Sequence, residues 1–377
     1  MRRRSPKPYH VLLFSSFSNL GNGGQESLFQ LATRLDRKHF NPMVLAPEEG
    51  SLSRRLREQS IETYILSLPK VSIKNVGSIG AAIGKLSALL EEKQIAILHS
   101  DGPRNTFYAG VVGHFKKRPL VWHVRSSESD FYDQLLSFLS SKIILVADAL
   151  AIRFPTESQR AKCITIHNGV DLQRFTPLTQ SCIESSNLIF DRPNVMVVHT
   201  GRVEVQKGQK HLIEACGRLR DQIPELRIVF AGEIKDGAYF QECLQCAGSM
   251  GVRERLRFLG HQENVSRLLQ ASDIFVMPSI RGEAFSRAIL EAMATGKPVV
   301  ATSCGGAAEA IIDYSSGFIV PPEDSAALAE KIALLATRED LRNQMGKSAR
   351  SRAEVFFGIE KNLERTIKVY EEVLRSR

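Results

Sequence analysis

The sequence of 377 residues is poor in cysteine and in long apolar runs. Six cysteines are scattered along it, and only Cys243 and Cys246 form a Cys-x-x-Cys pair, which has neither a second such pair nor a His-x3-His partner. This pattern argues against a structural zinc site and favours small, buried cysteines in a reducing compartment. No run approaches the roughly 18 consecutive apolar residues of a membrane-spanning helix, so none is expected.

The amino terminus is not expected to direct export. Met1–Arg4 has the charge of a signal-peptide n-region, but the apolar run Val11–Phe14 is too short for an h-region and favours a first strand. We therefore expect a cytoplasmic protein. Hydrophobic residues make up 43% and charged residues 24%, which is typical of a soluble globular chain, and the length suggests two domains.

The most informative stretch runs from Pro278 to Glu309. An apolar run before it predicts a buried strand, a turn carries Glu283, and a helix carrying Glu291 follows until Lys297-Pro298 ends it. The two carboxylates would be about 12 Å apart if the segment between them were helical. That span suits two hydroxyl-bearing ends of one extended ligand. The amide N–H groups of residues 284–286 would lie between the carboxylates, where a helix N-terminus favours an anion.

Strand-like and helix-like segments alternate along the whole chain. This alternation predicts parallel sheets covered by helices on both faces, with ligands at the carboxyl ends of the strands. His99 and His123 both stand at such ends. His99 is interpreted as a histidine that is hydrogen-bonded to nearby backbone. We expect helices at 76–92, 103–115 and 129–139 and strands at 9–16, 95–98, 120–123, 195–199, 227–231 and 274–277, among others.

Two loops have the composition of phosphate-binding turns. Gly21–Glu26 is glycine-rich and joins a strand to a helix, which lets backbone amides approach a phosphate. Arg202 and Lys207 share one strand-to-helix loop, where two cations can neutralise a diphosphate. Taken singly, each signal is weak: a capped tight turn or two solvated surface charges would give the same pattern.

Four motifs in order resemble those of retaining nucleotide-sugar glycosyltransferases of family four, also described as glycosyl transferases group 1. They are Gly-Gly-x-Glu at 23–26, Asn-Gly-Val-Asp at 168–171, Gly-Arg-x4-Lys-Gly at 201–208 and Glu-x7-Glu at 283–291. The resemblance implies the α/β GT-B fold, in which two Rossmann-like βαβ domains face each other across a cleft. It implies an acceptor-side domain at 1–171, a linker at 172–193, a nucleotide-sugar domain at 194–355 and a last helix at 356–377 that crosses back.

The resemblance also assigns roles to residues. It implies catalytic roles for His123, Arg202, Lys207 and Glu283. It implies that the donor is bound by Gly23, Gly24, Arg202, Lys207, Glu283, Ala284, Phe285, Ser286 and Glu291. It implies no metal and no cofactor apart from the co-substrate, a UDP- or GDP-linked sugar. Two positions depart from the family pattern: Val124-Arg125 follow His123 where an acid is usual, and Glu233 stands where a second glycine is common.

The acceptor is indicated only by charge. Of the net charge of +9, residues 1–171 carry +8, with 23 Lys and Arg against 15 Asp and Glu. Basic clusters at 2–4, 54–57 and 116–118 suggest an anionic membrane surface and a glycan or lipid-linked acceptor, as in cell-surface polysaccharide or lipopolysaccharide synthesis. A solvated basic surface explains the charge nearly as well.

Two other functional classes stay open. One is a nucleotide-sugar epimerase with the same fold, and the other is a non-catalytic transferase-like partner subunit. Nucleic-acid binding is not expected, because the sequence contains no recognition module and no interleaving of aromatic and basic residues.

Overall fold

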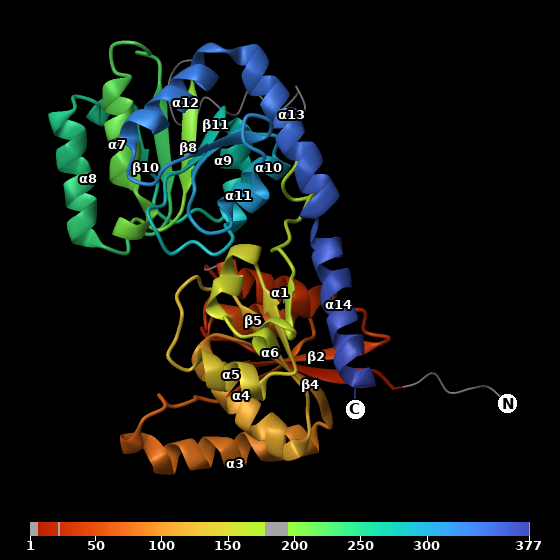
Figure 1. The fold of residues 1–377 in the computed structure, drawn as a ribbon. Helices are drawn as coiled ribbons and strands as arrows, with labels where there is room; N and C mark the ends of the chain where they lie inside the picture. Colours follow the sequence, from red (N-terminus) through yellow and green to blue (C-terminus); the bar gives the residue numbers. More distant parts are fainter. Residues whose placement is uncertain (1–6, 22, 178–194, 377) are drawn as a thin grey trace. The chain divides into compact units, whose positions relative to one another are not determined.

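A computed structural model describes residues 7–21, 23–177 and 195–376 (Figure 1). The chain divides into two compact units, residues 1–167 with 362–377 and residues 168–361. Each contains one wholly parallel sheet, so the predicted α/β class with two Rossmann-like domains is confirmed. No helix in the described ranges has both the length and the apolar character needed to cross a bilayer.

The first unit is built on a seven-stranded sheet in the order β3-β2-β1-β4-β5-β6-β7. Its strands are β1 (Tyr9–Phe14), β2 (Phe40–Ala46), β3 (Glu62–Ile65), β4 (Ile95–Asp101), β5 (Leu120–Val124), β6 (Lys142–Leu145) and β7 (Cys163–Thr165). Its helices are α1 (Gly23–Arg34), α2 (Ser51–Glu58), α3 (Val76–Glu92), α4 (Pro103–Lys116), α5 (Asp133–Leu139), α6 (Glu157–Arg160) and most of α14 (Ile359–Arg375), with 3₁₀ turns η1 (Ile73–Asn75) and η2 (Asp148–Arg153).

Helices cover both faces of this sheet because its central strands are apolar on both sides. Val11 and Leu13 of β1 pack in one core with α1, α2 and α14, whereas Leu12 and Phe14 pack in the other with α3 and α4. The polar end of β4 also stays in the sheet: Ser100 pairs in register with Phe14 and Trp122. Strand β4 therefore extends three residues beyond the predicted end, and His99 lies within it.

The second unit has a six-stranded sheet in the order β10-β9-β8-β11-β12-β13. Its strands are β8 (Met196–Thr200), β9 (Arg227–Ala231), β10 (Leu256–Phe258), β11 (Ile274–Met277), β12 (Val299–Thr302) and β13 (Gly317–Val320). Its helices are α7 (Gln209–Arg218), α8 (Gly237–Ser249), α9 (Val265–Ala271), α10 (Arg287–Ala294), α11 (Ala307–Ala310), α12 (Ser325–Thr337) and α13 (Glu339–Phe356), with 3₁₀ turns η4 (Val205–Lys207) and η5 (Arg253–Arg255).

The unit boundaries differ from the expected domain boundaries. The first division falls between His167 and Asn168 rather than after residue 171, and the described part of the expected linker, 172–177, belongs to the second unit. Most of that linker, 178–193, lies outside the described residues. At the other end the chain rejoins the first unit at Asn362, whose side-chain amide donates to the carbonyl of His167 at 2.6 Å.

The helix expected at 129–139 is shorter, beginning only at Asp133. The amide of Asp130 donates to the Asp133 carboxylate at 3.2 Å, and the amide of Tyr132 donates to the Asp130 carboxylate at 3.1 Å. Such side-chain acceptors compete with helical hydrogen bonds and hold this segment as a turn. Asp133 also forms a two-point ion pair with Arg153, at 3.0 and 2.7 Å, with both side chains more than nine-tenths buried.

This buried pair yields a stability prediction. Replacing Arg153 by Met should cost about 3–5 kcal/mol, because the Asp133 carboxylate is then buried without its partner, and Asp133→Leu in addition should recover much of the loss. Urea unfolding followed by the fluorescence of Trp122 measures this directly, since Trp122 is the single tryptophan and is buried against Arg153.

The exposed pair of Arg338 and Asp340 is the matched control, and Arg338→Met should leave the unfolding midpoint unchanged. An Arg153→Met variant as stable as the wild type would show that the buried pair does not stabilise the fold.

Candidate functional site

The candidate site of the second unit lies where two loops meet at the carboxyl end of its sheet. Strands β8 and β11 are neighbours, so the loop after β8 lies beside the loop after β11. The amide of Ile280 donates to the carbonyl of Gln206 at 2.9 Å, which joins the two loops through the backbone. Lys207 from the first loop forms an ion pair with Glu283 from the second, and Ser279 Oγ donates to the same carboxylate at 3.0 Å.

Glycine is required where these loops approach each other. Gly208 has a φ of +68°, and a Cβ there would lie 2.0 Å from the carbonyl oxygen of Pro278. Gly305, in the loop after β12, has a φ of +57°, and its Cβ would lie 2.0 Å from the carbonyl oxygen of Glu283. The amide of Gly306 donates to the carbonyl of Ala284 at 2.8 Å, so three loops together fix the turn that carries Glu283.

The turn between β11 and α10 presents backbone donors. Ser286 is the N-cap residue of α10. Within the part of the chain that the structure describes, the amides of Ala284 and Ser286 donate to no acceptor. Together with the positive end of α10, these N–H groups can bind an anion such as a phosphate.

Asn168 contributes to this turn from a distant part of the sequence. Its buried side-chain amide donates to the carbonyl of Phe285 at 2.9 Å, and Arg287 donates to the carbonyl of Gly169 at 3.1 Å. Asn-Gly-Val-Asp, interpreted from the sequence as the end of the first domain, therefore belongs to the second unit. Sequence reasoning missed Asn168 as a positioning residue, although its motif was recognised.

Arg202 lies in the loop after β8 with its side chain 42% exposed. Its guanidinium forms an ion pair with Glu204 at 2.9 Å, and its carbonyl accepts a hydrogen bond from the Gln209 side chain at 2.8 Å. The head group is therefore oriented and accessible, so that it can pair with an anion such as a phosphate.

His199 supports this loop from below and was not singled out by the sequence. Its Nδ1 donates to the carbonyl of Val276 at 3.0 Å, and its Nε2 lies 3.3 Å from the side-chain nitrogen of Gln209, from which it accepts. Burial lowers the pKa of His199 to about 4, so it stays neutral and acts as a structural link between β8, β11 and α7.

Glu291 lies on α10, eight residues after Glu283, with its side chain 17% exposed. Its carboxylate is 3.9 Å from Arg287 of the same helix. The second unit thus holds Arg202, Lys207, Glu283, residues 284–286 and Glu291, all of which were predicted from the sequence as donor-binding residues.

The remaining predicted residues lie in the first unit. Helix α1 begins at Gly23, and a Cβ on Gly24 would lie 3.8 Å from Cδ of Arg125 and 4.0 Å from a carboxylate oxygen of Asp101. The glycine-rich loop therefore runs beside the polar ends of β4 and β5. Ser16 Oγ donates to Asp101 at 2.8 Å, and burial raises the pKa of this carboxyl group, an effect that the nearby charge of Arg125 opposes.

His123 is buried in β5 and belongs to a hydrogen-bonded group. Arg125 Nη2 lies 3.1 Å from its Nδ1, and His99 Nε2 lies 3.2 Å from the same atom. His99 Nδ1 in turn lies 2.6 Å from the hydroxyl of Tyr370 on α14. The interpretation of His99 as bonded to nearby backbone is therefore wrong, because β4 and β5 are adjacent strands and place the two histidines side by side.

Burial and the neighbouring positive charge of Arg125 keep both histidines neutral. They lower the pKa of His99 to about 3 and that of His123 well below its usual value. His123 Nε2 is buried and has no hydrogen-bond partner within the described residues. A buried polar group of this kind costs roughly 1–3 kcal/mol when unpaired, so a ligand that pairs with it gains affinity.

Within the described residues, no group of three or more His, Cys, Asp or Glu side chains is arranged to hold a metal ion.

Comparison with known proteins gives matches along most of the chain. The family model for Glycosyltransferase Family 4 matches residues 21–174, and the model for Glycosyl transferases group 1 matches residues 183–352. A D-inositol 3-phosphate glycosyltransferase of Streptomyces avermitilis is 33% identical over 209 residues, which are 53% of this chain and 45% of that protein. The chain spans about half the length of the first curated relatives it matches.

Solved structures match over nearly the full length. A glycosyltransferase from Rickettsia africae has a TM-score of 0.88 at 20% identity, covering 99% of this chain and 100% of that one. Anabaena Alr3699/HepE in complex with UDP has a TM-score of 0.86 at 22% identity, covering 97% and 100%. These likenesses establish the fold, and with the two family models they show that the chain belongs to the family-four glycosyltransferases with the GT-B fold.

Proposed function

We propose that this chain is a retaining, metal-independent hexosyltransferase that uses a UDP- or GDP-linked sugar. The observation that carries the proposal is the arrangement of Arg202, Lys207 and Glu283 on two adjoining loops, beside the unbonded amides of Ala284 and Ser286. Cations and amides suit a diphosphate, and a carboxylate suits sugar hydroxyls. The structure of Anabaena Alr3699/HepE with UDP and glucose supports a donor of this kind.

Each residue has a definite part in the proposed reaction. The bond between the anomeric carbon and the diphosphate oxygen breaks, and negative charge grows on the departing diphosphate. Arg202, Lys207 and the amides of residues 284–286 stabilise that charge, an effect worth roughly 10²–10³ in rate for each group lost. Glu283 accepts hydrogen bonds from sugar hydroxyls, and Glu291 accepts them from the ribose.

The acceptor hydroxyl then attacks on the face that the diphosphate leaves. Its oxygen bonds to the anomeric carbon, and its proton passes to an oxygen of the diphosphate, so atoms and charge balance without a protein nucleophile. No Asp or Glu is assigned to a double displacement. The product keeps the anomeric configuration of the donor.

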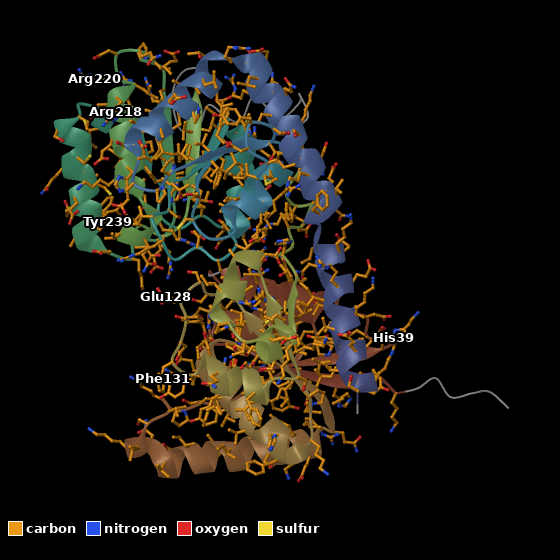
Figure 2. The ribbon with its side chains drawn as sticks, in the orientation of Figure 1. His39, Glu128, Phe131, Arg218, Arg220 and Tyr239 are labelled. Atoms are coloured by element: carbon orange, nitrogen blue, oxygen red, sulfur yellow. The ribbon has the colours of Figure 1, made fainter. Side chains whose placement is uncertain are left out.

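The acceptor proposed here is a glycan or lipid-linked molecule of cell-surface polysaccharide or lipopolysaccharide synthesis, reached at an anionic membrane. Exposed aromatic side chains support it: Phe131 is 95%, Phe115 77% and Phe138 69% exposed. His114 joins the last two, with its ring centroid 6.0 and 6.3 Å from theirs. Figure 2 shows Phe131 beside α5, at the edge of the first unit. The basic cluster 116–118 follows α4 directly.

The reaction is tested with Arg202→Ala. Transfer of sugar from UDP- or GDP-sugars to glycolipid and oligosaccharide acceptors should fall about 10²–10³-fold, because charge on the departing diphosphate is no longer stabilised. The ligand-free melting temperature should not change, since the side chain is loop-borne and solvated. NMR of the product should show the anomeric configuration of the donor.

Arg220→Ala is the matched control, because Arg220 is a 44% exposed arginine paired with Asp221 in the same unit (Figure 2). Its transfer rate should equal that of the wild type. Full activity in Arg202→Ala, or a large fall in its melting temperature, would contradict the assigned role. Conversion of the donor sugar without any acceptor would favour the epimerase instead.

Membrane association is tested by sedimentation with vesicles containing anionic phospholipid. Binding should occur at low salt and weaken at high salt, since each basic side chain near such a surface contributes about 1 kcal/mol. Phe131→Ser with Phe138→Ser should weaken it at either salt concentration, whereas Phe356→Ser, an exposed phenylalanine of the second unit, should not. Absence of wild-type sedimentation at low salt would rule out the membrane proposal.

A further inference from the structure

The hydrogen bonds around His123 leave one arrangement of protons. The guanidinium of Arg125 can only donate, so His123 Nδ1 at 3.1 Å must accept and carries no proton. A neutral imidazole then holds its proton on the other nitrogen, which makes His123 Nε2 an N–H donor. This is the buried atom that has no partner within the described chain.

The proton position on His123 also determines the hydrogen-bond directions at His99 and at Tyr370 on α14. Because His123 Nδ1 has no proton, the contact at 3.2 Å requires His99 Nε2 to donate. His99 Nδ1 is then the acceptor in its neutral ring, and it accepts from the hydroxyl of Tyr370 at 2.6 Å. The direction of every bond in the series is therefore fixed from Tyr370 to His99 to His123.

The series is held rigidly in the first unit. Tyr370 is fully buried, and its ring packs edge-on against His99 and against Phe40, with centroids 5.7 and 5.6 Å away. Strands β4 and β5 place the histidines at diagonal positions two residues apart in register, since His123 pairs with Asp101 and His99 pairs with Val121. Arg125 lies near the buried carboxyl group of Asp101, and its positive charge opposes the rise that burial causes in the pKa of that group.

We infer that Tyr370, His99 and Arg125 are positioning residues that hold His123 as its Nε2–H tautomer, so that His123 donates a hydrogen bond to a bound substrate and does not act as a base. The inference rests on the proposed function for the identity of the acceptor atom only. The tautomer itself is a property of the ligand-free protein. Through Tyr370, helix α14 would thus help to determine which nitrogen of His123 carries the proton, although α14 lies outside the loops of the site.

The family usually has an acid after His123, whereas this chain has Val124-Arg125. In the structure, Arg125 contacts His123 directly. An ionised acid next to a histidine accepts a hydrogen bond from the ring and stabilises its charged form, whereas an arginine can only donate to the ring. His123 in this chain is therefore set for hydrogen-bond donation across the whole range of physiological pH. Arg125 and His99 are the titratable groups that contact His123; Asp101 is its register partner on β4, and Tyr370 is joined to it through His99.

The tautomer is measured by long-range proton–nitrogen correlation NMR on ligand-free protein labelled with ¹⁵N-histidine. The signal of His123 is identified as the one lost in His123→Gln, and His39→Gln, at an exposed surface histidine (Figure 2), checks the assignment. The wild type at pH 7 should show His123 protonated on Nε2 alone. A ring protonated on Nδ1, or on both nitrogens, would overturn the inference without reference to glycosyl transfer.

The positioning role is measured with Tyr370→Phe, Arg125→Met and the two combined. The combined variant should give a mixture of His123 tautomers and lower kcat on the order of tenfold, with an unchanged KM for the nucleotide sugar. His99→Gln should retain the Nε2–H tautomer, because an amide can donate to His123 and accept from Tyr370. An unchanged tautomer and unchanged kcat in the combined variant would overturn the role.

These readouts separate the inference from the proposed function. If the NMR signals behave as described but no sugar is transferred to any acceptor, the positioning series stands and the proposed function fails. Far-ultraviolet circular dichroism and the melting temperature of each variant establish that it is folded, and Tyr370→Phe preserves the ring that packs against Phe40.

Discussion

The ion pair between Lys207 and Glu283 is the contact on which the second unit's site depends. It joins the loops after β8 and β11, which come from distant parts of the sequence and meet because parallel strands end at one edge of the sheet. Its side chains are only 19% and 12% exposed, so removing one partner leaves a shielded charge, at a cost of up to about 3–5 kcal/mol. The same two side chains are the ones that we propose bind a diphosphate and a sugar.

Glycine and backbone hydrogen bonds make that contact possible. Gly208 and Gly305 allow two loops to approach the turn at distances that no side chain tolerates, and Asn168 holds the carbonyl of Phe285. The site is thus built mostly from main-chain constraints, with few side chains left for chemistry. That division is consistent with the short glycine-containing motifs by which this region was identified in the sequence.

Much of the fold could be predicted from the sequence because apolar runs mark buried parallel strands. Strands β9 and β11 and helix α3 begin and end as expected. Errors arose where local polar contacts decide the outcome: side-chain acceptors at Asp130 and Asp133 shorten α5, and sheet pairing carries polar His99 and Asp101 into β4. No local pattern in a single sequence reports such pairings.

The charged residues Arg202, Lys207, Glu283 and Glu291 were proposed from the sequence because they stand in motifs that resemble those of the family, and the structure places Lys207 and Glu283 in contact. The supporting residues could not be predicted in this way. His199 links β8 to β11, and Tyr370 contacts His99 across 271 residues of sequence. Hydrogen bonds over such separations follow from the topology of the sheets, which sequence spacing does not contain.

The most direct test of the account is a thermal-shift panel with UDP, GDP, ADP and their sugars in the presence of a chelator. One nucleotide should raise the melting temperature, corresponding to about 2.7 kcal/mol at a hundred times its dissociation constant. That rise should diminish in Glu291→Ala, which loses the proposed ribose contact, and persist in Glu330→Ala, which alters an exposed carboxylate. If no nucleotide or nucleotide sugar stabilises the wild type, the assignment of Arg202, Lys207 and Glu291 as a donor site is contradicted.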